Sequence, residues 1–372
     1  MESARIDCTG VNRYGVGPAT GAIGEKPGPT GCDMRLIGLV EDEEHVCCRY
    51  RLRAFQSYWA AAGYALQLQR LPKGWWGRWF WDRAVAEADG VIVQRKLLPV
   101  WAVRRLRRYV RRLIYDFDDA LWLRDSYARR GLEDGRRRRR FAGMIRRCDL
   151  VVAGNNFLAE RVRRVAPTTP VIVVPTCVDP ARYPLARHER VLPAAVRLVW
   201  IGSHSTLQGL ERFRQTLSRL GQVLPGLRLK LICDRSLEIP GLPVEFVSWS
   251  ETTEAVELAH ADIGISWLPP DDWSRGKCGL KVLQYQAAGL PVVANPVGVQ
   301  AEMVQPGING FWAQTEEEWV EAIQRLGWDP ELRRQMGAAG RQQVEQRYSV
   351  VAAAQEWLEA LSRWILPRRL AS

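Results

Sequence analysis

The chain has few histidines and no CxxC pair of cysteines, and these absences limit the chemistry that it can carry out. Only four of its 372 residues are His, and none of the eight cysteines belongs to a CxxC pair, so a metal site is not expected. No apolar run reaches the ~20 residues of a membrane-spanning helix, and the N-terminus has no apolar signal core. We therefore expect a cytoplasmic protein, either free or peripheral on the inner face of the membrane.

Positive charge is abundant but unevenly distributed. The formal net charge is +12, and the segment from Arg104 to Arg147 holds 16 Arg, no Lys and six acidic residues, a local balance of +10. Such a patch attracts phosphate-bearing partners, namely an anionic membrane surface, a nucleic acid or a phosphorylated substrate. The patch lacks the interleaved aromatic residues of a base-stacking platform, so no nucleic acid is expected. A solvated Arg-rich surface without a partner is the alternative.

Short β-branched runs alternate with helical stretches from Met34 onwards, which predicts parallel sheets with crossover helices. The expected strands are 35–40, 65–69, 90–94, 113–116, 150–153 and 171–174 in the first half, and 197–201, 228–233, 244–247, 263–267, 291–294 and 310–313 in the second. The predicted fold is α/β, with two Rossmann-like doubly wound domains facing a cleft. Ligands of such sheets bind at the carboxyl ends of the strands.

Composition also suggests the domain boundaries. Residues 1–33 are rich in Gly, Pro and Thr and are expected to be a disordered extension, with Met34 as the physiological start. A proline-interrupted linker over 180–195 would separate an N-terminal Rossmann-like domain, 34–185, from a C-terminal Rossmann-like domain, 196–349. Residues 350–372 are expected to form a C-terminal helix and tail. Apolar residues at helical spacing in this helix need a surface to cover.

The most informative segment joins a strand ending near Trp267 to a helix that we expect to begin near Lys277. It carries Arg275, Lys277 and Lys281, and cations beside helix amide groups are suited to a diphosphate. Lys277 and Lys281 would lie one helical turn apart and share a face. An ordinary basic first turn is the alternative interpretation.

The same segment carries a family resemblance. Residues 277–293 read KCGLKVLQYQAAGLPVV, and residues 298–311 read GVQAEMVQPGINGF. With Asp329-Pro330 and Tyr348-Ser349, these motifs resemble the C-terminal domain of glycosyltransferase family 4, whose members are retaining enzymes of the GT-B fold. The resemblance extends over roughly 199–349 and continues more weakly from 34 to 183.

The resemblance implies a donor site. Gly202 and Ser203 look like the glycine loop at the donor diphosphate, with Ser205 or Thr206 capping the next helix. Gly276 and Gln284 fall where the family has the two glutamates of its E-x7-E motif. Gln284 can still bond a ribose hydroxyl, but the sugar contact of the first glutamate is missing. The implied donor-binding residues are Gly202, Ser203, Arg275, Lys277, Lys281, Gln284, Val299 and Glu302.

Three carboxylates follow a predicted buried strand, at Asp116, Asp118 and Asp119. They fit an Asp-x-Asp metal motif, or a Mg²⁺-dependent phosphatase loop of the haloacid dehalogenase type with Asp116 as nucleophile and Asp118 as acid/base. The interpretation that we favour places Asp116 and Asp118 on the acceptor side of a GT-B site. Carboxylates paired structurally with nearby arginines are a further alternative. Arg49 and Arg51, after the first strand, are candidates for binding an acceptor phosphate.

The resemblance, taken with these features, implies a retaining glycosyltransferase of the hexosyltransferase class that moves a sugar from a nucleotide sugar to a glycan or lipid-linked acceptor in polysaccharide biosynthesis. The basic patch 104–147 would then contact an anionic membrane surface or a polyprenyl-diphosphate-linked acceptor. Asp116, Asp118 and Lys277 are the predicted catalytic residues. No metal or other cofactor is expected, because fixed cations can stabilise the leaving diphosphate and the leaving phosphate can accept the acceptor's proton. The alternatives are the phosphatase and a nucleotide-sugar-binding protein without catalytic activity.

Overall fold

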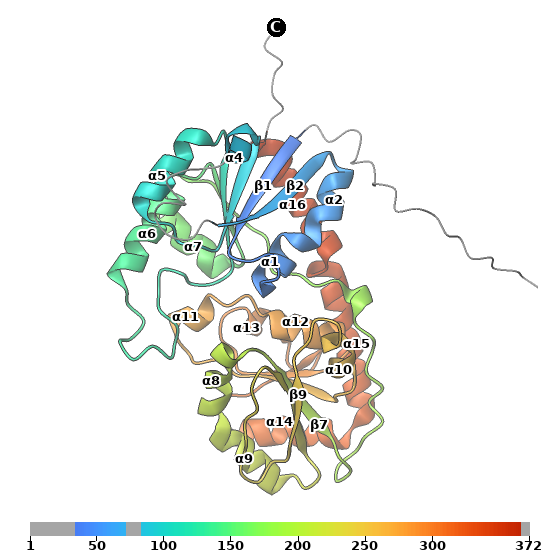
Figure 1. Ribbon diagram of the computed structural model, residues 1–372. Coiled ribbons are helices and arrows are strands. Elements are labelled where there is room, and N and C mark those ends of the chain that lie inside the picture. Colours follow the sequence, from blue (N-terminus) through green and yellow to red (C-terminus); the bar gives the residue numbers. More distant parts are fainter. Residues whose placement is uncertain (1–33, 72–82, 366–372) are drawn as a thin grey trace, which may run out of the picture. The chain divides into compact units, whose positions relative to one another are not determined.

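The computed structural model describes residues 34–71 and 83–365 (Figure 1). The expected extension over 1–33 and the final residues of the expected tail lie outside the described residues. The described residues form one compact unit that holds both sheets. Every strand pair within each sheet is parallel, and the predicted α/β class with two doubly wound sheets is therefore confirmed.

The first sheet has the strand order β2-β1-β3-β4-β5-β6. Its strands are β1 (Met34–Val40), β2 (Tyr64–Arg70), β3 (Gly90–Gln94), β4 (Leu113–Phe117), β5 (Leu150–Ala153) and β6 (Val171–Val173). The helical segments of this half are α1 (Val46–Arg51), η1 (Arg53–Phe55), α2 (Gln56–Ala61), α4 (Arg83–Glu87), α5 (Val100–Tyr109), α6 (Gly135–Ile145), α7 (Asn156–Val165) and η2 (Pro180–Arg182). The strand bounds agree with the sequence prediction to within one residue.

The second sheet has the strand order β12-β11-β10-β7-β8-β9. Its strands are β7 (Arg197–Ile201), β8 (Arg228–Cys233), β9 (Val244–Ser248), β10 (Ile263–Ser266), β11 (Val292–Ala294) and β12 (Gly310–Trp312). Its helices are α8 (His204–Arg212), α9 (Arg214–Val223), α10 (Glu254–Ala259), α11 (Asp272–Arg275), α12 (Leu280–Ala287), α13 (Gln300–Met303), α14 (Glu316–Trp328) and α15 (Pro330–Arg347). The last helix of the chain, α16, spans Val350–Trp364.

Alternating side chains of β1 build cores on both faces of the first sheet. Ile37 and Leu39 pack with α5, α6 and α7, whereas Leu36 and Val40 face α2 and α16. Successive residues of a strand point to opposite faces, so an apolar run such as Leu36–Val40 indicates a strand that is covered on both sides. The sheet is therefore buried except at its edges and strand ends.

The apolar residues at helical spacing in α16 cover one face of the first sheet, as the sequence pattern required. Trp357 is fully buried and packs edge-on against Trp59 of α2, with ring centroids 5.1 Å apart. Just before α16, Ser349 forms a bridge with Val178, which follows β6. The chain therefore returns from the second sheet and completes the core of the first.

Candidate functional site

The carboxyl end of the second sheet carries the two lysines expected to bind the donor diphosphate. Lys281 lies in the first turn of α12, with its ammonium 4.4 Å from the centre of the Trp200 ring at the end of β7. Burial, and then the charge of Lys277, lower the pKa of Lys281 to about 7. An anion bound here would favour the charged form of Lys281.

Lys277 is not part of this helix, and the expectation that it shares a helical face with Lys281 was wrong. Helix α11 ends at Arg275, and α12 begins only at Leu280, after Gly279 adopts a left-handed conformation with φ 68°. A positive φ interrupts a right-handed helix, and glycine adopts it without strain. Lys277 therefore extends from a short connecting loop.

Arg275 has different partners from the two lysines. Its side chain is about half exposed, pairs with Asp272 three residues earlier, and lies over the ring of Phe157. The three predicted donor cations therefore divide into two lysines in the interior and one arginine at the surface.

Gly202 and Ser203 connect the end of β7 to the start of α8, as the predicted glycine loop requires. Ser203, not Ser205, is the N-cap residue of α8, and Thr206 accepts the backbone N–H of Ser203 at 3.1 Å. A Cβ at Gly202 would lie 2.4 Å from the Trp200 ring. Glycine is therefore needed here for local packing, whether or not a ligand approaches.

The carboxyl end of the first sheet carries a second cluster of charge. Arg95 follows β3, and its guanidinium contacts Asp118 at 3.3 Å and also pairs with Asp119, both of which follow β4. The ammonium of Lys277 lies 2.9 Å from the other oxygen of Asp119. Burial opposes ionisation of Asp119, but Lys277 and Arg95 outweigh it and lower its pKa. This ion-pair cluster joins the carboxyl ends of the two sheets.

The backbone around Gly276 explains the missing first glutamate of the resemblance. A Cβ at Gly276 would lie 2.7 Å from both the Cβ and the backbone nitrogen of Ala120. Asn155 strengthens the same contact, donating to the carbonyl groups of Gly276 and Lys277 at 3.3 and 3.1 Å. A glutamate cannot be accommodated at position 276 while the segment after β4 occupies this space.

Asp116 and Arg51 form a buried ion pair in the first sheet. Both are almost completely inaccessible, and Arg51 also donates to the carbonyl of Val174 at 2.6 Å. Burial raises the pKa of Asp116 even though Arg51 opposes the shift. Neither side chain has an exposed surface for substrate. This argues against Asp116 as a phosphatase nucleophile or as a catalytic residue on the acceptor side, and against Arg51 as an acceptor contact.

Arg49 and Gln284 belong to another buried network. Arg49 pairs with Glu254 of α10 and donates to the hydroxyl of Tyr50 at 2.7 Å. Gln284, expected to contact ribose, donates instead to the hydroxyls of Tyr50 and Tyr183 at 3.2 and 3.4 Å. The structure therefore engages Arg49 and Gln284 in hydrogen bonds and ion pairs within the protein.

The remaining predicted donor residues, Val299 and Glu302, differ in how close they lie to the loop that carries Lys277. Val299 is buried and reaches the space beside Gly279, at the start of α12. Glu302 is exposed on α13, and its side chain has no ion pair or hydrogen bond within the described part of the chain. Val299 lies close to the lysine loop, and Glu302 faces solvent.

Sequence reasoning missed His45 and Arg95 as members of the site, and it counted Asp119 among the three carboxylates after the predicted strand without giving it a role. His45 caps α1, and its Nδ1 accepts the backbone N–H of Cys47 at 3.2 Å. Burial and then the charge of Arg95 lower the pKa of His45, so the ring is neutral near pH 7. Isolated residues after separate strands give no local motif. Their position at the carboxyl ends of parallel strands was the signal that could have identified them.

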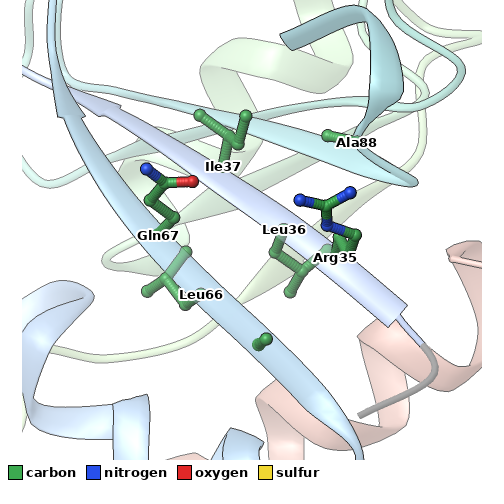
Figure 2. Close-up of a pocket in the computed structure, with 7 residues that line it drawn as sticks. Arg35, Leu36, Ile37, Leu66, Gln67 and Ala88 are labelled. Atoms are coloured by element: carbon green, nitrogen blue, oxygen red, sulfur yellow. The ribbon is translucent and has the colours of Figure 1, made fainter. Parts of the chain in front are cut away.

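Two cavities lie away from the lysines. One cavity has a volume of about 220 Å³. It is lined by residues at the starts of β1 and β2, which Figure 2 shows as sticks. It therefore lies at the opposite ends of these strands from the ion-pair cluster. Another, of about 260 Å³, is lined by residues that include Arg182, Tyr183 and Glu254. It borders the network of Arg49.

The described residues contain neither a candidate metal site nor a membrane-spanning helix. Within residues 34–71 and 83–365, no group of three or more His, Cys, Asp or Glu side chains is arranged to hold a metal ion. In the same part of the chain, no helix has the length and hydropathy needed to span a bilayer.

Solved structures of glycosyltransferases match this chain. Sucrose-phosphate synthase from Thermosynechococcus elongatus has a TM-score of 0.70 at 15% identity, covering 89% of this chain and 98% of that one. Anabaena HepE in complex with UDP and glucose has a TM-score of 0.62 at 17% identity, covering 89% and 100%. A glycosyltransferase from Rickettsia africae has a TM-score of 0.64 at 12% identity, covering 89% and 98%. At these identities the likeness shows the fold.

Part of the sequence also matches the model of a protein family. Residues 210–359, less than half of the chain, match a family model described as glycosyl transferase-like. A search of curated proteins finds no match. The family match and the architecture together confirm the predicted fold and enzyme class, a glycosyltransferase with the GT-B fold.

Proposed function

We propose that the chain is a retaining glycosyltransferase related to family 4 that uses a nucleotide sugar, with UDP-glucose as the first candidate donor. The observation that carries this proposal is the pair Lys277 and Lys281 at the carboxyl end of the second sheet. Asp119 is the carboxylate that pairs with Lys277, and no ion pair is found for Lys281 among residues 34–71 and 83–365. This leaves positive charge at the place where ligands of such sheets bind.

The proposed chemistry needs stabilisation of a departing nucleoside diphosphate. The bond from the sugar's anomeric carbon to the phosphate oxygen breaks, and the acceptor oxygen bonds to that carbon from the same face. The acceptor's proton passes to the departing phosphate oxygen. Lys277, Lys281 and the first amide groups of α12 stabilise the charge that develops on the diphosphate. Asp118, the more exposed carboxylate of the cluster, is assigned to orient the acceptor hydroxyl, and no metal is assigned.

Nucleotide binding and product stereochemistry test this function. We expect UDP and UDP-glucose to raise the melting temperature more than GDP or ADP, since a ligand at 100 times its Kd stabilises a fold by about 2.7 kcal/mol. With a glycan or polyprenyl-phosphate acceptor, the anomeric proton of the product should show retained configuration, and EDTA should leave the rate unchanged. If none of the nucleotides shifts the melting temperature, the donor assignment is wrong.

We further propose that the acceptor is membrane-linked and that α5 and α6, side by side in Figure 1, face an anionic bilayer. Neither helix contains an acidic residue, and both expose arginines. Trp101 and Tyr109 are each 39% exposed on α5 and add aromatic groups suited to a membrane interface. The lipid-linked acceptor would then be presented beside the first sheet.

Vesicle sedimentation tests this surface. Each arginine near an anionic bilayer contributes about 1 kcal/mol, so changing Arg104, Arg108 and Arg136 to Gln should weaken binding to phosphatidylglycerol vesicles by roughly 100-fold. The matched control changes three exposed arginines of the other half to Gln: Arg214, Arg219 and Arg228. Binding that persists in 0.5 M salt, or that falls equally in both triple variants, would contradict the proposal.

A further inference from the structure

Asp119 connects the two clusters of charge. It lies two residues after β4, and its side chain is only 7% exposed. One of its oxygens pairs with Arg95 from the first sheet, and the other lies 2.9 Å from the ammonium of Lys277 in the second half of the chain. A carboxylate buried between two cations has little rotational freedom, so each partner's position depends on the other.

Arg95 is itself held firmly. Its backbone adopts φ 59°, in the left-handed region that non-glycine residues rarely occupy. Its N–H donates to the carbonyl of Asp116 at 2.7 Å, and its carbonyl accepts the hydroxyl of Tyr115 at 3.1 Å. Such a conformation persists only where the surroundings determine it. Arg95 therefore provides a fixed anchor for one side of Asp119.

Lys277, by contrast, lies in a loop and depends on its side-chain contacts for orientation. Its ammonium lies 3.6 Å from the centre of the Trp273 ring, and its side chain is 22% exposed. An ammonium group has three N–H donors, of which Asp119 accepts one. The ion pair with Asp119 leaves donors available for a ligand and fixes their direction.

The backbone contact described above places Asp119 at this loop. Ala120 fills the space beside Gly276, and the thiol of Cys278 donates to the carbonyl of Asp118 at 3.2 Å. The segment after β4 is therefore packed directly on the loop that carries Lys277. The second half of the chain has no glutamate at position 276, and Asp119 from the first half brings a carboxylate to the same loop.

We propose that Asp119 is a positioning residue for donor binding, which holds the ammonium of Lys277 in the direction needed to contact the donor diphosphate. The inference rests on the proposed function. Asp119 itself does not contact the diphosphate, whose charge it would repel. It acts through Lys277, with Arg95 as its anchor in the first sheet.

A double-mutant cycle with UDP tests the inference. By calorimetry, Asp119→Asn should weaken UDP binding about tenfold, the scale of one charge-assisted hydrogen bond. The loss should appear in KM for the nucleotide sugar more than in kcat. In a Lys277→Ala background, the same change should have no further effect, because the group through which Asp119 acts is gone. Glu345→Gln, which breaks the pair of the exposed Glu345 with the partly buried Arg341 on α15, is the matched control and should leave UDP affinity unchanged.

The outcomes separate the possibilities. If Asp119→Asn does not fold, Asp119→Glu takes its place; it keeps the charge but moves it by one methylene, and we expect a loss of about two- to fivefold that again disappears with Lys277→Ala. Equal losses in both backgrounds, or unchanged UDP affinity in a folded Asp119 variant, would overturn the inference alone. If the wild-type protein binds no UDP, the proposed function fails and the inference fails with it.

Discussion

Replacing Arg51 by methionine should lower the free energy of unfolding by about 3–5 kcal/mol, the effect expected when one partner of a buried ion pair is removed. Asp116 would then lie in the core of the first sheet without its bidentate partner, and the carbonyl of Val174 would lose its donor. Chemical denaturation at pH 7 measures the loss. Arg138→Met, which breaks the exposed pair with Glu133, should cost no more than about 1 kcal/mol.

The effect of Arg51→Met should depend on pH. The pKa of Asp116 is already raised in the folded protein, and loss of Arg51 raises it further. The folded variant then binds a proton at a pH where the unfolded chain does not, so its stability rises as the pH falls. The deficit should therefore shrink between pH 7 and pH 5, and Arg51→Met combined with Asp116→Asn should be more stable at pH 7 than Arg51→Met alone. A pH-independent loss, or one below about 1 kcal/mol, would contradict the buried-pair account.

Replacing Lys277 by alanine should weaken UDP binding by roughly 10- to 150-fold, because hydrogen bonds to charged groups contribute about 1.5–3 kcal/mol. The same range applies to Lys281→Ala. Arg275→Ala provides the internal comparison, because Arg275 is exposed and paired with Asp272. Its loss should change UDP affinity less than about threefold. Calorimetry at constant salt gives all three values, and an Arg275→Ala effect equal to that of Lys277→Ala would contradict the site.

Lys281 adds a pH signature to this comparison. Its pKa of about 7 leaves it largely neutral at pH 8 in the unliganded protein. Because a bound diphosphate favours the charged form, UDP binding at pH 8 should take up protons. Calorimetry in two buffers of different ionisation enthalpy measures this uptake. Lys281→Met should abolish it, and uptake that survives in this variant would assign it to another group.

The strands could be predicted from the sequence because most are short segments rich in β-branched and other apolar residues, whereas the exact ends of the helices could not. The run from Leu113 to Phe117 is buried on both faces and has the pattern of an interior parallel strand. The sequence around Lys277 also favours a helix. Whether the helix begins at residue 277 or 280 depends on the φ of Gly279, which nearby residues do not determine.

The site was predicted only in part for a related reason. The lysines were recognisable because a known motif surrounds them, but the partners of Arg51 and Gln284 are distant in sequence. Arg51 pairs with Asp116, 65 residues away, and Gln284 donates to Tyr50, 234 residues away. Such pairings depend on how the two sheets are assembled, which local patterns do not encode. Local charge therefore predicted the kind of site, but not which charges remain available to a ligand.

The return of α16 to the first sheet determines how the protein can be divided experimentally. A fragment that stops at residue 185 would lack Trp357 and Leu361, which are fully buried in the intact chain, and would leave Trp59 exposed. Cleavage in the connection between β6 and β7 would not release two independent pieces, because a second crossing near Ser349 still joins them. An N-terminal fragment would need residues 350–365 fused to it or supplied in trans to regain its native core.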